Sequence, residues 1–231
     1  MSETNPPRRL LVSGRAVARY WGVHHALVAQ AERAGLIHKF VVTHDAPGAE
    51  PRDDGDPSAS GPREGAEPEV VEQGYDASRI LDLGRRPFVD PDDLVAFDPE
   101  SILLVQQTNK RRHVPSEPDW HIRAAYGWHV DMPVRDAVDS ARGWWAVDPR
   151  RRYGVQAIVS VVSSFAGTLA IVDREKRIEL HPDGRVMYPA TAADDTTALG
   201  RHLIRVFQGR RVPVRQGVSR LVPQIESPTI G

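Results

Sequence analysis

The stretch Gly14-Arg-Ala-Val-Ala-Arg-Tyr-Trp-Gly-Val-His-His-Ala-Leu-Val-Ala-Gln-Ala-Glu-Arg-Ala-Gly-Leu-Ile37 decides the fold at the start of this 231-residue chain. A pair of short crossing helices needs a small residue where the helices meet, a glycine at the turn and an apolar residue in the second helix. Ala18, Gly22 and Val28 occupy those three places. The spacing therefore predicts two helices joined by a tight turn.

This is the spacing of a helix-turn-helix, whose second helix offers its outer face to a groove of DNA. We expect double-stranded DNA as the ligand, contacted by four outward side chains: His24, His25, Gln30 and Arg33. The same pattern also fits an ordinary amphipathic helix pair in an α/β domain that binds no DNA.

Strands are predicted on both sides of the helix pair, over residues 10–13 and 36–43. The order of strand, two helices and wing-like strand resembles the small winged helix-turn-helix of the excisionase and MerR type. The resemblance implies a DNA-binding head over residues 8–45. The chain departs from those families where His24 and His25 replace the Ser or Thr that usually caps the second helix. A short two-fold DNA site would require a homodimer.

Charge is segregated along the chain, although the net formal charge is only -1. Residues 1–42 hold six basic and two acidic side chains, whereas residues 43–76 hold two basic and ten acidic ones. Residues 46–70 are also rich in Pro, Gly and Ser, so they predict an acidic disordered linker. We therefore expect a second unit over residues 71–225.

Beyond the linker, helical and strand-like patterns are mixed. Helices are predicted over residues 90–97, 134–141 and 195–208, and a short helix or turn over residues 77–84. Strands are predicted over residues 101–107, 144–147, 153–164, 168–173, 177–180 and 185–188, with a tight hairpin turn at Asp183-Gly184. The expected fold class is α+β: a small winged helix-turn-helix joined by an acidic linker to an α+β domain with a mainly antiparallel sheet.

A series of features in residues 90–225 has the order of a known accessory domain. The features are an apolar strand at 102–105, a basic turn at 110–112, the Ala-Arg-Gly-Trp-Trp-Ala-Val segment at 141–147 and a basic segment at 201–222. Together they resemble the domain that follows the core in some bacterial GIY-YIG nucleases. The Gly-Ile-Tyr and Tyr-Ile-Gly strands of the nuclease core are missing. The resemblance therefore implies a DNA-associated domain and does not transfer catalysis.

Residues 199–222 contain six arginines and no acidic residue. The planar guanidinium of arginine fits phosphate well, so we expect this segment to contact the DNA backbone. The alternatives are pairing with acidic groups of a partner or of the same domain, and plain solvation, because the chain has only three lysines and uses arginine almost throughout. The six residues are Arg201, Arg205, Arg210, Arg211, Arg215 and Arg220.

His121, His129 and Asp131 lie within eleven residues and carry side chains that can bind zinc, manganese or iron. They define an alternative function, a nuclease-related or small metal-dependent enzyme, for which a divalent metal would be the cofactor. A second alternative is a protein-interaction module whose basic end meets an acidic partner. The absence of cysteine excludes disulfides and thiolate chemistry.

No apolar run approaches the roughly 20 residues of a membrane helix, and residues 1–9 lack the apolar region of a signal peptide. The sequence thus predicts a cytoplasmic protein with no membrane partner. The function that it favours is non-catalytic DNA binding without a cofactor, with transcription regulation as the candidate role.

Overall fold

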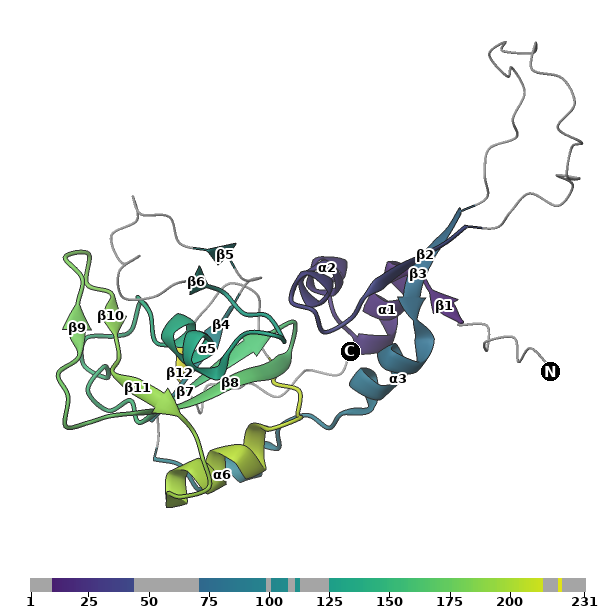
Figure 1. Cartoon of the computed structure of the whole chain (residues 1–231). Coiled ribbons are helices and arrows are strands. Elements are labelled where there is room, and N and C mark those ends of the chain that lie inside the picture. The colour runs from purple at the N-terminus through teal and green to yellow at the C-terminus, as the bar shows by residue number, and fades with distance from the viewer. Residues whose placement is uncertain are drawn as a thin grey trace, which may run out of the picture.

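The computed structural model describes residues 10–43, 71–98, 101–107, 111–112, 125–213 and 220–221. These residues form an α+β structure whose sheets are mainly antiparallel, arranged as two packed units (Figure 1). The N-terminal unit, called the head below, comprises residues 10–43 and 71–85. Within the described residues, no helix is both long enough and apolar enough to span a membrane.

Local sequence sets the ends of the two helices that open the head. Helix α1 (Gly14–Trp21) begins after Ser13, whose Oγ accepts a hydrogen bond from the N–H of Ala16 at 3.3 Å. It ends at Gly22, which adopts a φ of 65° that glycine tolerates best. Helix α2 (His25–Arg33) begins after His24, whose Nδ1 accepts from the N–H of Ala26 at 3.3 Å. An imidazole therefore fills the capping place of a Ser or Thr.

Three antiparallel strands complete the head together with helix α3 (Ala77–Arg85). The strands are β1 (Leu11–Val12), β2 (Lys39–Thr43) and β3 (Val71–Asp76). Strand β3 lies between the other two, with Val12 and Lys39 both opposite Tyr75. The structure thus differs from the division expected at residue 71, because β3 is the central strand of the head. The expected linker, residues 46–70, lies outside the described residues.

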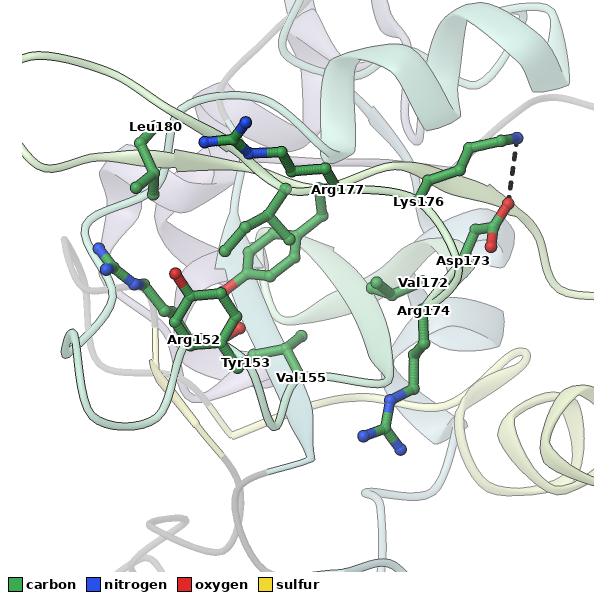
Figure 2. Close-up of a pocket in the computed structure, with 11 residues that line it drawn as sticks. Arg152, Tyr153, Val155, Val172, Asp173, Arg174, Lys176, Arg177 and Leu180 are labelled. Carbon is green, nitrogen blue, oxygen red and sulfur yellow. Dashed lines mark hydrogen bonds and ion pairs between the residues drawn. The ribbon is translucent and has the colours of Figure 1, made fainter.

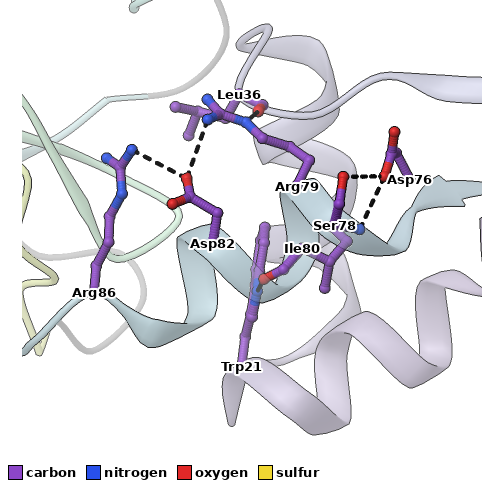
Figure 3. Close-up of polar contacts among 8 residues, drawn as sticks. All are labelled: Trp21, Leu36, Asp76, Ser78, Arg79, Ile80, Asp82 and Arg86. Atoms are coloured by element: carbon purple, nitrogen blue, oxygen red, sulfur yellow. Dashed lines mark hydrogen bonds and ion pairs between the residues drawn. The ribbon is translucent and has the colours of Figure 1, made fainter.

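Polar contacts fasten α3 to the rest of the head (Figure 3). The indole N–H of Trp21 donates to the carbonyl of Ile80 at 3.1 Å, and Nε of Arg79 donates to the carbonyl of Leu36 at 3.2 Å. Asp82 also pairs with Arg79 at 3.3 Å. Because α3 bonds to both α1 and the loop after α2, the residues that follow the β2–β3 connection are part of the head's core.

The second unit is built on a five-stranded sheet with the strand order β11-β8-β7-β4-β12. Its strands are β4 (Ile102–Gln106), β7 (Ala157–Val162), β8 (Phe165–Val172), β11 (Ala190–Ala192) and β12 (Arg220–Leu221). Only the β4–β7 pair is parallel; the other three neighbouring pairs are antiparallel. A parallel pair needs a crossover, and helix α5 (Val134–Ala141) lies in that connection. The remaining short elements are α4 (Pro91–Leu94), β5 (Arg111–Arg112), β6 (Ala125–Tyr126), β9 (Glu179–Leu180) and β10 (Val186–Met187).

Both faces of this sheet are covered by helices. Along β4, Ile102 and Leu104 belong to the buried cluster on the side of helix α6 (Ala198–Phe207). Leu103 and Val105 belong to the cluster on the side of α5. Side chains of a strand alternate between faces, so an unbroken apolar strand is the pattern that a two-sided core requires. Figure 1 shows α5 and α6 on opposite sides of the sheet.

Several predicted elements match the structure, and one does not. The predicted helix over 134–141 is present with the same bounds, and the turn at Asp183-Gly184 joins β9 to β10. The predicted strand over 144–147 is absent; Trp145 only forms an isolated bridge with Val186. The reason is that this segment follows α5 directly and has a single short strand beside it.

The head packs on the turn between β7 and β8. Trp21 meets Phe165 edge-on with ring centres 5.2 Å apart, and Val162 lies in the same buried cluster. The hydroxyl of Ser163 donates to the carbonyl of Leu27 at 2.7 Å. Ser163 has a φ of 51°, which is uncommon for a residue with a side chain. Contact with the head thus accompanies a strained turn, and Val162 and Phe165 of the second unit extend the apolar core of the head.

Candidate nucleic-acid interface

One stripe of α2 faces away from both the head's core and the second unit. His25 and Arg33 are exposed and Ala29 is half-buried between them, and these three residues are spaced four apart, so they lie on one side of the helix. The buried residues Leu27 and Val28 lie elsewhere on its circumference. Among the ion pairs of the described residues, none includes Arg33. The stripe therefore presents an uncompensated cation to solvent.

His24 lies at the N-terminal end of this stripe and is exposed, as predicted for a DNA contact. Its Nδ1 is occupied by the capping bond to Ala26, and its ring lies 4.2 Å from that of His25, centre to centre. The cap holds the His24 ring at the helix end. His25, which has no capping role, is the freer of the two imidazoles.

Gln30 does not belong to the solvent-facing stripe. Its Nε2 donates to the carbonyl of Gln107, at the end of β4 in the second unit, and its side chain is partly buried. The expected contact with a base edge is therefore not open to this side chain in the structure. The physical reason is the docking of the second unit, which covers the side of α2 where Gln30 lies.

Arg211 is the largest departure from the predicted phosphate-binding segment. Only 4% of this residue is exposed. One of its terminal nitrogens donates to the carbonyl of Trp21, and the guanidinium carbon lies 4.3 Å from the centre of the Phe88 ring. Burial lowers the pKa of Arg211. Its charge joins the head to the second unit, so the expected DNA contact is wrong for this residue.

The other arginines of the segment have separate surroundings. Arg210 forms an ion pair with Asp93 at 3.0 Å, so it is engaged within its own unit. Arg201 and Arg205 are exposed on α6; Arg201 donates to the carbonyl of Asp195 at 2.7 Å, and Arg205 contacts a ring nitrogen of His202 at 2.8 Å. Arg215 and the side chain of Arg220 lie outside the described residues. The structure thus divides what the sequence presents as one basic run.

The candidate metal ligands are only partly described, since His121 lies outside the described residues. Nδ1 of His129 accepts from the N–H of Asp131 at 3.1 Å and lies 3.6 Å from the Asp131 carboxylate. In the described part of the chain, no three His, Cys, Asp or Glu side chains gather in a metal-binding group. His129 instead packs on the head: a Cβ added to Gly35 would lie 2.7 Å from its Nε2.

His129 also borders a cavity of about 370 Å³ whose described walls all belong to the second unit. Its other walls include Trp128, Met132 and Gly167, and Thr168 supplies a buried hydroxyl that has no hydrogen-bond partner among the described residues. A pocket of this size with aromatic and apolar walls suits a small apolar molecule that carries one polar group.

A second cavity is surrounded by basic residues that the sequence analysis did not single out (Figure 2). Arg152 comes from the turn before β7, and Arg174 and Arg177 come from the loop after β8. The signal in the sequence is a pair of basic segments at 150–152 and 174–177, which lie on either side of the two strands predicted over 153–164 and 168–173. Asp173 precedes the second basic segment and Glu175 lies within it, so the net charge of this part of the sequence does not reveal its basic residues.

Comparison of the chain with protein-family models, with curated proteins and with solved structures returns no match.

Proposed function

We propose that the protein binds double-stranded DNA without cleaving it, through the stripe of His25, Ala29 and Arg33 on α2. The observation that carries the proposal is this stripe, whose two ends, His25 and Arg33, stay exposed although three other residues of α2 are buried and Gln30 is bonded to the second unit. A recognition helix needs an open side of this kind to enter the major groove.

The arrangement of the head also supports the proposal. Two crossing helices are followed by the β2–β3 hairpin, which is the element order of a winged helix-turn-helix with β2 and β3 as the wing. His38 and Lys39 are exposed where β2 begins. Exposed basic residues on a wing suit contacts with the phosphate backbone, which position a protein without reading sequence.

Regulation of transcription is the role that we assign to this binding. Within the stripe, Arg33 would read guanine or hold a phosphate, and the methyl group of Ala29 would meet thymine. A site with two-fold symmetry would bind two copies of the protein.

The test compares Arg33→Ala with Arg135→Ala by titrating a fluorescent duplex at two salt concentrations. Loss of Arg33 should weaken binding by about 1 to 3 kcal/mol if it contacts a base, and should make the salt slope shallower by up to about 0.9 if it contacts a phosphate. Arg135 is an exposed arginine on α5 of the second unit and does not belong to the predicted DNA-contacting residues, so its replacement controls for loss of charge.

Equal weakening in both variants would mean that DNA is held by general charge and would refute the role of α2. Unchanged affinity of Arg33→Ala would refute it as well. Cutting of the duplex in the same samples, checked with and without a divalent metal, would contradict the non-catalytic part of the proposal.

A further inference from the structure

The cavity of Figure 2 lies in the second unit, at the side from which β9 and β10 project (Figure 1). Its volume is about 250 Å³, which exceeds by several times the roughly 30 Å³ share of one water molecule. The floor is made of Val155, Val172 and Tyr188, which are all buried. The hydroxyl of Tyr188 donates to the carbonyl of Arg152 at 3.1 Å and so holds the turn of Arg152 against the floor.

Cations are in excess around this cavity. Four basic side chains line it (Arg152, Arg174, Lys176 and Arg177), and the carboxylate of Asp173 is its only acidic neighbour among the described lining residues. Lys176 pairs with Asp173 at 3.0 Å, and this contact is the first cause of the lowered pKa of Asp173. The three arginines have no such ion-pair partner among the described residues. Three positive charges therefore remain uncompensated around one hollow.

Arg152 and Arg177 are placed to act together. Figure 2 shows both side chains at the end of the cavity that Leu180 borders, whereas Arg174 and Lys176 extend from the other end. The guanidinium of Arg152 lies 5.0 Å from the centre of the Tyr153 ring, and its Nε is buried with no hydrogen-bond partner in the part of the chain that the structure describes. A buried N–H group without a partner has lost its hydrogen bonds to water and gained none in return. A bound acceptor would supply the missing hydrogen bond.

We propose that this cavity binds a phosphate group, held by Arg152 and Arg177. Arginine forks match the geometry of both phosphate and carboxylate oxygens. An excess of three positive charges favours phosphate, because a phosphate monoester carries about 1.5 to 2 negative charges at neutral pH whereas a carboxylate carries one. The exposed ring of Tyr153 and the apolar side of Leu180 flank the site and can contact the organic part of a phosphoester.

A phosphate group of this kind is carried both by a free nucleotide and by the backbone of a nucleic acid. The experiment therefore titrates the full-length protein by calorimetry with inorganic phosphate, adenosine 5′-monophosphate and acetate, and separately with a DNA duplex. The variants are Arg152→Gln and Arg177→Gln, each with its melting temperature measured. The control is Arg150→Gln, which changes an exposed arginine of the same turn that does not line the cavity.

We expect phosphate and the nucleotide to bind more tightly than acetate. Each pocket variant should weaken phosphate binding about tenfold or more, the loss typical of one charge-assisted hydrogen bond, and Arg150→Gln should bind as the parent does. Because Arg177 is exposed, Arg177→Gln keeps the test valid even if Arg152→Gln does not fold. If only the duplex binds, and both pocket variants weaken it while Arg150→Gln does not, the phosphate belongs to a nucleic acid backbone.

Three results would overturn the proposal: no ligand responds to the two pocket variants, acetate binds as tightly as phosphate, or Arg150→Gln weakens binding as much as they do. The free-phosphate titration does not depend on the head. Arg33→Ala should leave it unchanged, so failure of the DNA-binding proposal and failure of the phosphate site give different patterns.

Discussion

Arg210 and Arg211 are neighbours of the same residue type, yet their replacement should have very different consequences. We predict that Arg211→Met lowers the free energy of unfolding by about 1 to 3 kcal/mol, whereas Arg210→Met lowers it by about 0.2 to 1 kcal/mol. Methionine is unbranched and apolar, so it fills most of the space of either side chain without adding a new hydrogen bond.

The larger magnitude follows from the contacts of Arg211. A hydrogen bond from a charged donor to the Trp21 carbonyl contributes about 1.5 to 3 kcal/mol, and the cation–π contact with Phe88 contributes about 0.5 to 2 kcal/mol. Part of this total is returned, because the substitution ends the burial of a guanidinium that has no carboxylate partner among the described residues. Arg210 instead holds one partly exposed ion pair with Asp93.

The assay is urea denaturation of the parent and both variants, followed by circular dichroism, with the free energy of unfolding taken by linear extrapolation. The expected order of stability is parent, then Arg210→Met, then Arg211→Met. Surface substitutions usually change stability by no more than about 0.5 kcal/mol. An Arg211→Met value that close to the parent, or a larger loss in Arg210→Met, would refute the view that Arg211 joins the two units.

Three further predictions concern the head and its contact with the second unit. Gly35→Ala should destabilise the protein by about 1 to 3 kcal/mol more than Gly22→Ala in the same urea assay. Both glycines have a positive φ, but only at Gly35 would an added Cβ meet other side chains, those of His129 and Val130. Equal losses of stability in the two variants would contradict this close packing. Burial and the hydrogen bond to Glu32 raise the pKa of Tyr75 to about 12, so its contribution to stability is full below pH 10, the ordinary value, and is lost as the pH rises toward 12. The stability difference between the parent and Tyr75→Phe should therefore shrink over that range, and a difference independent of pH would argue against the shift. After a protease site is inserted between residues 46 and 70 and cleaved, both pieces should elute in one peak in gel filtration. The reason is that β2 and β3, which lie on either side of the cut, remain paired. Separation of the pieces would show that this pairing is too weak to hold them together.

Much of the local structure follows from residues close together in the sequence. Ser13 and Gly22 bound α1, and the Asp183-Gly184 turn joins two short strands, because capping and turn geometry depend on atoms only a few residues apart. The unbroken apolar pattern of residues 102–105 likewise predicts a strand buried on both faces. The exposed stripe of His25 and Arg33 could also be predicted from the sequence, because the helical period alone places these residues on a different side of α2 from the buried ones.

Only the tertiary structure decided which surfaces are free. The sequence divides the chain at an acidic segment, but β3 returns across that segment to pair with β2, and a pairing partner so far along the chain leaves no local signal. Gln30 and Arg211 are of residue types that contact DNA, and they stand at positions where the sequence suggests such contacts. The docking of the two units, however, engages Gln30 with Gln107 and buries Arg211 against Trp21. Conversely, the basic cavity forms because two turns separated by the β7–β8 hairpin meet beside Tyr188. Helix ends depend on near neighbours, whereas the exposure of a charge depends on which distant surface packs over it.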